Sequence, residues 1–428
     1  MRWFQKGAFL LFVGGAALLW AGCASENSPS EGAKSAAVRA TSGERSESDG
    51  TRRVVDSRVK PFLVEGSKAL DRGNYQRALA LADSAEKYEP NLPLISFFRG
   101  SVYAEQNKLG AARTAYRTVL ELDSTYPEAR LKLGNIAFDR GKFRTALRLY
   151  RGEQKVSATS ALHVKIARTY QKLGVADSAR TAYEEALALD STNANAHMMY
   201  GQFLEDQGEL ETALTHSRRA LALNPENTNY QFAVGSQLYR TGHLEEAARH
   251  LERAADQRLL HSAAQYNLGQ VLRRLGRTEE AERYFARADT ARRLIEEISS
   301  AQEEASRNPN RVGSWVKLGE LYREARALDR ALEAFDRAAR LRPRNLTVQH
   351  RIAEILLQKG QIEDATQRLR AILDADRSFG KAWLDLGRAY AAEGQCDEAR
   401  RAWRRALDHQ SSGDAARTHL DTRCTGGG

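Results

Sequence analysis

The stretch WVKLGELYREARALDRALEAFDRAARLRP, residues 315–343, contains the pattern that decides the fold. Gly319 follows an apolar residue and precedes Tyr322 by three positions. In the second half of the stretch, the small residue Ala331 precedes the aromatic residue Phe335 by four positions. Apolar residues recur at helical spacing in both halves. A small residue lets a second backbone approach closely, so the stretch predicts two antiparallel helices that meet at their small residues.

The same spacing recurs ten times along the chain. The small residue marks each unit, and its steps are 34 residues except for one of 33 and one of 50. The markers are Gly66, Gly100, Gly134, Ala167, Gly201, Gly235, Gly269, Gly319, Ala353 and Gly387. An alanine stands twelve residues beyond every marker, and a glycine stands seven residues beyond all but two, where Asn107 and Arg326 occur. We interpret this glycine as the left-handed cap of the first helix.

The eighth unit fills a known family pattern completely. It resembles the tetratricopeptide repeat at Trp315, Leu318, Gly319, Tyr322, Ala331, Phe335, Ala338 and Pro343. The tenth unit follows it closely, and the resemblance extends from about Val59 to Ser411. It implies an all-α, right-handed superhelical solenoid of about ten helix–turn–helix repeats that share one continuous core. The family serves as an interaction scaffold in many contexts, so the fold alone does not specify a function.

The step of 50 residues marks an insertion of 16 after the seventh unit. Residues 278–307 contain no Pro or Gly, which predicts one helix of about 28 residues. Its extra part keeps an apolar stripe of Ala291, Leu294, Ile295, Ile298, Ala301 and Ala305. The stripe either packs on the neighbouring repeat or docks a partner. After His409, a short helical stretch to about Leu420 predicts a terminal cap, since a solenoid must cover its last apolar face.

Composition and charge exclude several classes of protein. Apolar residues make up 42% and charged residues 28%, with eight prolines, which is typical of a helical chain that is not embedded in a membrane. The net charge of +10 is spread among mixed charges and forms no basic stripe, so we expect no nucleic-acid partner.

The sequence contains no catalytic motif that we recognise. It lacks a phosphate-binding loop, an H-E-x-x-H motif and a nucleophile elbow, so we predict no enzyme and no cofactor. His243, Glu246 and His250 share a helix face, but a zinc site usually needs further ligands, and no metal site is predicted. His163 and His197 are interpreted as partly buried packing residues.

The N-terminus has the features of an export signal. Arg2 and Lys6 precede 14 uncharged residues, Gly7–Trp20, which is too short for a spanning helix. The end of this run, with a small residue before Cys23, resembles the lipobox of bacterial lipoproteins, although Trp20 occupies the usual Leu position. The resemblance implies acylation (palmitate or a related chain) of Cys23 and an outer-membrane anchor facing the periplasm. Cleavage after Ala24, or no cleavage at all, are the alternatives.

The segment that follows is rich in Ser, Glu, Gly and Ala and cannot bury enough surface to fold. We therefore divide the chain into a signal peptide at 1–22, a lipidated cysteine with a disordered tether at 23–57, repeats one to seven with the extended helix at 58–307, repeats eight to ten at 308–411, and a capping helix and tail at 412–428. If Cys23 takes lipid, Cys396 and Cys424 remain and would form a disulfide in an oxidising compartment. Two independent thiols are the alternative.

The family resemblance also implies where a partner binds. First helices of the repeats line a concave groove, and amides and apolar side chains there would hold an extended peptide. The candidate residues are Asn135, Phe138, Arg168, Gln202, Phe232, Tyr239, Tyr266, Gln270 and Arg273. The apolar members could instead pack in the core. The lysine needed for a carboxylate clamp is absent, since Leu131 occupies its place.

The sequence thus predicts a non-enzymatic, lipid-anchored scaffold or adaptor in the bacterial envelope, serving assembly, secretion, pilus or polysaccharide machinery. The alternative is an accessory subunit that recruits a glycan or a polymer-modifying enzyme. The sequence does not specify the oligomeric state.

Overall fold

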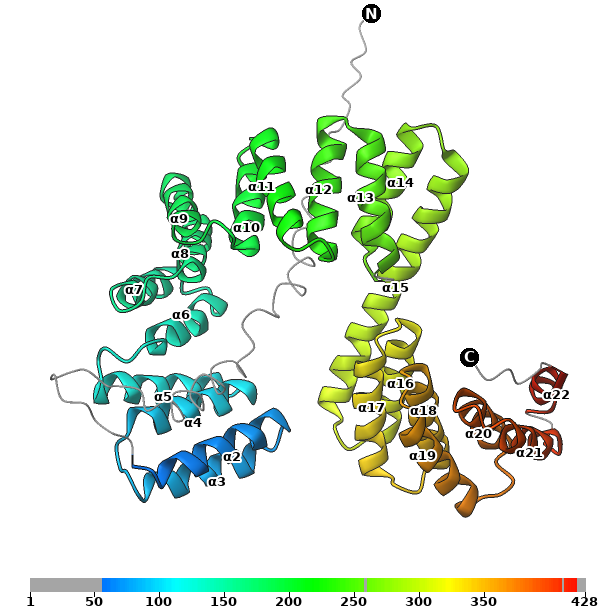
Figure 1. Cartoon of the computed structure of the whole chain (residues 1–428). Coiled ribbons are helices and arrows are strands. Elements are labelled where there is room, and N and C mark those ends of the chain that lie inside the picture. Colours follow the sequence, from blue (N-terminus) through cyan, green and yellow to red (C-terminus); the bar gives the residue numbers. More distant parts are fainter. Residues whose placement is uncertain (1–55, 258–259, 410–411, 422–428) are drawn as a thin grey trace, which may run out of the picture. The chain divides into compact units, whose positions relative to one another are not determined.

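The computed structural model describes residues 56–257, 260–409 and 412–421. These residues form 21 helices and no strand, which confirms the all-α repeat architecture (Figure 1). They divide into two compact units, with the boundary between Gly242 and His243 inside the sixth repeat. No helix within the described ranges has both the length and the apolar character needed to cross a bilayer.

The first unit contains five complete repeats and the first helix of the sixth. Even-numbered helices are the first helices of the repeats, and odd-numbered ones are the second. The bounds are α2 Val59–Asp71, α3 Tyr75–Glu86, α4 Pro93–Glu105, α5 Leu109–Leu122, α6 Ala129–Asp139, α7 Phe143–Gln154, α8 Ser160–Leu173, α9 Ala176–Leu189, α10 Ala194–Asp206, α11 Leu210–Leu223 and α12 Thr228–Thr241. Within this unit α6, α8 and α10 line the inner side of the curve, and α7, α9 and α11 line the outer side (Figure 1).

The second unit begins with the second helix of the sixth repeat. Its helices are α13 Leu244–Gln257, α14 Ser262–Arg274, α15 Thr278–Arg307, α16 Val312–Glu324, α17 Leu328–Leu341, α18 Leu346–Gln358, α19 Ile362–Ala375, α20 Gly380–Ala392, α21 Cys396–Leu407 and α22 Gly413–Asp421. The division of the repeats into seven and three stays a prediction.

Five of the marker glycines lie against a ring from the second helix of their own repeat, whereas Gly66 meets Phe98 of the next repeat and Gly201 meets the Ser217 hydroxyl. A Cβ atom added to Gly100 would stand 2.6 Å from Tyr116 Cε1, and one added to Gly319 would stand 2.8 Å from Phe335 Cε1. The same arrangement pairs Gly134 with Tyr150, Gly269 with Phe285 and Gly387 with Trp403. The ring stands sixteen residues after the marker, which explains the recurrence of both positions.

The predicted left-handed caps are confirmed. All eight glycines seven residues beyond the markers have positive φ, from +69° at Gly141 to +88° at Gly242. Asn107 and Arg326, which replace glycine in the second and eighth repeats, adopt the same conformation, each with φ of +55°. The turn between the two helices therefore demands this conformation whatever residue stands there.

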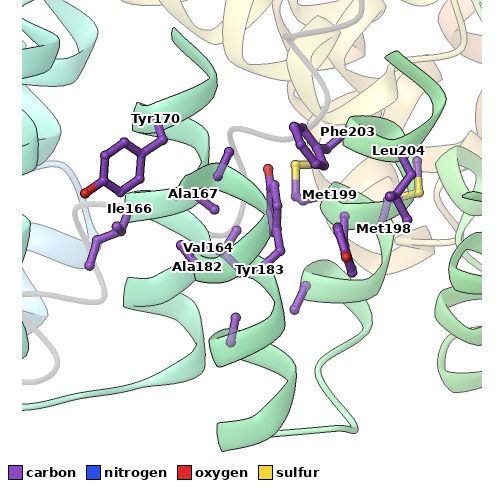
Figure 2. Packing of buried hydrophobic residues seen from close by; sticks show 14 of the residues in the cluster. Val164, Ile166, Ala167, Tyr170, Ala182, Tyr183, Met198, Met199, Phe203 and Leu204 are labelled. Carbon is purple, nitrogen blue, oxygen red and sulfur yellow. The ribbon is translucent and has the colours of Figure 1, made fainter. Parts of the chain in front are cut away.

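The core of the first unit continues from one repeat to the next. Figure 2 shows Tyr183 of α9 between Ala167 of α8 and Phe203 of α10. The ring of Tyr183 stacks on Tyr200 with centroids 5.4 Å apart and lies 5.7 Å from Phe203. Because Tyr183 contacts helices of two repeats, burial of one repeat depends on the presence of the next.

The long helix is confirmed as α15, which spans 30 residues. Its extra part belongs to the same hydrophobic cluster as the eighth repeat, through Leu294, Ile298, Ala301 and Ala305. Gln302 donates a hydrogen bond to the hydroxyl of Tyr322 on α16 at 2.6 Å. The stripe therefore packs on the neighbouring repeat.

The capping helix is also confirmed, as α22. Ala416 is fully buried in a cluster with Trp403 and Leu384, and His419 stacks on the Trp403 ring at 5.1 Å. Other predictions fall outside the described residues: the signal peptide, Cys23, the tether up to residue 55, and Cys424. Cys396 opens α21 and is half-buried, and its bridge to Cys424 stays a prediction.

The close approach of glycine and ring yields a test within one repeat. Gly100→Ala should destabilise the first unit by about 2 kcal/mol, because the added methyl overlaps the Tyr116 ring. Gly110→Ala, on the facing helix α5, is the control, since no atom lies within 4 Å of its added Cβ. Urea unfolding and hydrogen exchange of α4 and α5 measure both variants. Equal effects of the two substitutions would contradict this account.

Candidate functional site

Six of the predicted groove residues lie on first helices of the first unit. Asn135 and Phe138 come from α6, Arg168 from α8 and Gln202 from α10, whereas α12 supplies Phe232 and Tyr239. Gln202 is exposed, and the other five are half-buried. Tyr150 lies against Gly134 of α6, whereas the Ser217 hydroxyl takes the place of a ring against Gly201 of α10.

Asn135 and Gln202 differ in the hydrogen bonds that their side-chain amides make within the chain. The Tyr150 hydroxyl donates to Asn135 Oδ1 at 2.9 Å, which leaves the amide nitrogen without a hydrogen-bond partner in the described part of the chain. The Gln202 amide has no partner among the described residues. Both side chains can therefore donate to a carbonyl of an extended backbone.

Phe138 and Arg168 join the third and fourth repeats. The Arg168 guanidinium lies over the Phe138 ring, 5.5 Å from its centroid, and Phe143 meets the same ring edge-on at 5.3 Å. This arrangement places a cation over one face of an apolar ring.

The other three predicted residues form a row on α14 of the second unit. Gln270 donates to the Tyr266 hydroxyl at 2.8 Å, and Arg273 donates to Gln270 Oε1 at 2.7 Å. Tyr266 is 44% exposed and rests against Phe285 at 5.4 Å. Because Gln270 is bonded on both sides, the group offered to a ligand is the Tyr266 ring and its hydroxyl hydrogen.

Most apolar residues at the position of Tyr266 in other repeats are core residues instead. Leu63, Phe97, Val164, Met198 and Leu384 are buried. For these residues the alternative of simple packing, which the sequence left open, holds.

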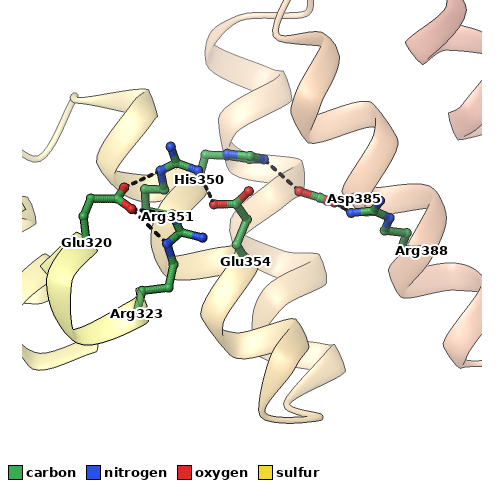
Figure 3. A network of polar contacts seen from close by, with 7 residues as sticks. All are labelled: Glu320, Arg323, His350, Arg351, Glu354, Asp385 and Arg388. Carbon is green, nitrogen blue, oxygen red and sulfur yellow. Dashed lines mark hydrogen bonds and ion pairs between the residues drawn. The ribbon is translucent and has the colours of Figure 1, made fainter. Parts of the chain in front are cut away.

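A charged network on the first helices of repeats eight to ten escaped the sequence analysis as a group (Figure 3). Glu320 of α16 pairs with Arg323 at 2.6 Å and with Arg351 of α18 at 2.7 Å. Arg351 also holds Glu354 at 2.7 Å. Further along, Asp385 of α20 accepts from both His350 and Arg388 at 2.9 Å. The signal was present as a change from mostly uncharged polar residues in the earlier repeats to Glu320, Glu354 and Arg388 at the equivalent position of these repeats.

A cavity of about 990 Å³ lies between α17, α18 and α19 in the second unit. Leu346, Ile352, Leu356 and Ile372 form its apolar lining, and Arg344 and Asp364 supply charges. Its lining residues run from Leu332 to Ala375, so the cavity is separate from the row on α14.

Two histidines of the fifth repeat face each other. His197 Nε2 donates to the Ser191 carbonyl at 3.1 Å, so its Nδ1 carries the lone pair and accepts from His216 Nδ1 at 3.0 Å. Burial lowers the pKa of His197, and burial together with the neighbouring His197 lowers the pKa of His216. His163 is buried between Thr159 and Gln154. His163 and His197 are thus packing residues, as predicted.

The histidine pair makes the first unit sensitive to acid. Because the folded pKa of each ring lies below the unfolded value of about 6.5, the unfolded state binds more protons and stability falls as the pH drops through that value. His216→Asn should reduce this loss, since the amide can still donate to His197 but does not titrate. Hydrogen exchange of α10 and α11 at pH ~7.5 and pH ~5.5 measures it. The same substitution at exposed His243 should leave the pH dependence of these helices unchanged; an equal effect would refute the assignment.

Curated relatives match only short parts of the chain. The general transcriptional corepressor ssn6 of Schizosaccharomyces pombe is 32% identical over 96 residues, which is 22% of this chain and 9% of that protein. The CTR9 homologue of Arabidopsis thaliana is 26% identical over 121 residues, 28% of this chain and 11% of that protein. The chain thus spans about a tenth of the length of these relatives.

Solved structures share the helical repeat fold at low identity. A fragment of MamA from Desulfovibrio magneticus is 19% identical, covers 40% of this chain and 97% of its own, and has a TM-score of 0.36. YrrB, described as a repeat protein with an unusual peptide-binding site, is 20% identical over 43% of this chain and 95% of its own, also with a TM-score of 0.36.

Family models match successive stretches of the chain. A TPR repeat model covers residues 100–141, and a tetratricopeptide repeat model covers 164–228 and 233–294. The TPR domain of cytochrome c-type biogenesis protein H matches residues 302–417. These matches fall on α4–α6, α8–α11, α12–α15 and the end of α15 through the start of α22, and they confirm that the chain is built of tetratricopeptide repeats.

Proposed function

We propose that this chain is a non-enzymatic scaffold, anchored to the bacterial envelope through Cys23, that binds extended segments of partner proteins on its first helices. Tetratricopeptide repeats support an interaction role in general. The observation that carries the proposal is the register of two amides with unused donors, Asn135 on α6 and Gln202 on α10. Asn135 and Gln202 stand two repeats apart at equivalent positions, and Arg168 occupies the position between them.

This register suits an extended peptide in the first unit. A peptide lying across α6, α8 and α10 would present its carbonyls to the amides of Asn135 and Gln202. An apolar side chain would rest on the Phe138 ring, and the guanidinium of Arg168 beside it favours a partner with an acidic residue there.

The row on α14 offers a second contact point of a different kind. The exposed Tyr266 ring can stack on a partner side chain, and its position is fixed by Gln270 and Phe285. A rigid aromatic residue loses little conformational entropy on binding, which makes it an effective anchor. Once a partner is bound at one of the two contact points, its effective concentration at the other contact point is raised.

The envelope role rests on the sequence and on one family match. The charged start, short apolar run and Cys23 favour export with lipidation. The match of residues 302–417 to a cytochrome c-type biogenesis TPR domain supports a role in assembling other proteins. Lipid attachment at Cys23 would concentrate the scaffold at the membrane.

Peptide binding can be tested in cells and then in solution. Crosslinking should capture an envelope protein, and a synthetic peptide from its crosslinked segment should bind the purified chain. Asn135→Ala/Phe138→Ala/Gln202→Ala should weaken that peptide at least ~10-fold, a loss of about 1.4 kcal/mol measured by calorimetry. The control Leu122→Ala/Leu189→Ala removes two exposed apolar side chains from second helices and should leave the affinity unchanged. Equal losses, or a captured glycan with no protein, would refute the peptide mechanism.

Lipid anchoring has its own test. Cys23→Ser should abolish labelling with a palmitate analogue and release the protein from the membrane fraction, because the acyl chains supply the anchoring energy. Ser25→Ala, two residues away, should stay labelled and membrane-bound. Retention of Cys23→Ser in the membrane would show that another element provides the anchor.

A further inference from the structure

His350, Glu354 and Asp385 converge where the ninth and tenth repeats meet within the second unit (Figure 3). One donor atom of each residue lies within 4.8 Å of the donor atoms of the other two. We propose that these three side chains bind a divalent transition-metal ion, with Zn²⁺ as the expected occupant. The site would link the first helices of two successive repeats.

Helix geometry accounts for the convergence. His350 and Glu354 stand four residues apart on α18, so both side chains project from the same face. Asp385 lies on α20, 35 residues after His350, which is one repeat further along plus one position. Stacking of α20 beside α18 therefore brings the third donor to the first two.

The two central donors are buried and held in place. The side chains of His350 and Asp385 are 3% and 5% exposed, and His350 Nε2 lies 2.9 Å from Asp385 Oδ2. Arg388 fixes the other oxygen of Asp385 at 2.9 Å, and Phe379 packs on the imidazole with centroids 5.3 Å apart. A buried carboxylate and imidazole so oriented lose little freedom when they take a metal ion.

Glu354 completes the set from the more accessible side. Arg351 holds its Oε2 at 2.7 Å, and Glu320 in turn holds Arg351 at 2.7 Å. Hydrogen-bonded outer residues of this kind orient carboxylate ligands in metal sites generally. The same arginines repel a cation, so we expect weaker binding than at a structural zinc site of four protein ligands.

The donor set selects the class of ion. One neutral imidazole and two carboxylates carry a charge of −2, which matches a divalent ion, and the nitrogen donor favours Zn²⁺ over Mg²⁺ or Ca²⁺. Three protein ligands leave a fourth position for water. On binding, the ring proton moves from Nε2 to Nδ1, the Nε2 lone pair bonds the metal, and Asp385 Oδ2 exchanges its hydrogen bond for a metal bond.

Metal titration of the full chain tests this site. After treatment with a chelator, the wild-type chain should bind one more equivalent of Zn²⁺ than His350→Gln does. Bound Zn²⁺ should also slow hydrogen exchange of α18 and α20, because a ligand that binds only the folded state stabilises it. Co²⁺ in place of Zn²⁺ should give visible absorption bands from a nitrogen- and oxygen-ligated ion. Both signals should disappear in His350→Gln.

Glu354→Gln separates binding from folding. This variant keeps the buried pair of His350 and Asp385, so the second unit should fold as before while its Zn²⁺ affinity falls at least ~10-fold. His250→Gln is the matched control, since His250 faces Glu246 at 3.9 Å on α13 and the described residues bring no third metal-binding atom close to this pair. Unchanged Zn²⁺ affinity in His350→Gln and Glu354→Gln, or an equal loss in His250→Gln, would overturn the proposal and leave the network a purely structural salt bridge.

Discussion

The close approach of the two helices at the marker residue is the constraint on which the repeats depend, and in five repeats a ring of the second helix lies directly against a marker glycine. With hydrogen in place of a side chain, Gly100 and Gly319 allow rings to lie where a methyl group would stand. The ring fills the space between the two helices and fixes their separation and rotation together. Where the ring also reaches the next repeat, as Tyr183 does, one contact orders two successive units.

That constraint determines which side chains remain for binding. Since the second helix covers one face of each first helix, residues such as Phe97 and Val164 are enclosed, whereas Gln202 and Tyr266 face outward. The repeat thus converts a 34-residue period in sequence into a regular spacing of donors and rings. Such a surface varies by substitution at exposed positions without disturbing the core, which is why the fold itself carries little information about the partner.

Spacing made the fold predictable and made the candidate site only partly so. The left-handed caps were predicted at the recurring glycines, and the structure adds that Asn107 and Arg326 adopt the same conformation, since the turn requires a left-handed residue there. The pairing of His350 with Asp385 did not, because it joins different helices and depends on side-chain directions that a repeat pattern does not encode. The binding groove was likewise expected as one set of residues, whereas the structure assigns those residues to two compact units.

The charged network shows how a repeat array can depart locally from apolar packing. At the position of His350, other repeats bury Leu63, Phe97 or Val164, whose contacts need no partner of defined direction. An imidazole and a carboxylate at the same depth must satisfy each other, because an unpaired buried charge is costly. The ninth and tenth repeats are therefore joined by a directional contact between His350 and Asp385, whereas Leu63, Phe97 and Val164 make contacts without a preferred direction. Binding of the proposed metal ion at this contact would make the stability of the segment formed by α18 and α20 depend on the concentration of that ion.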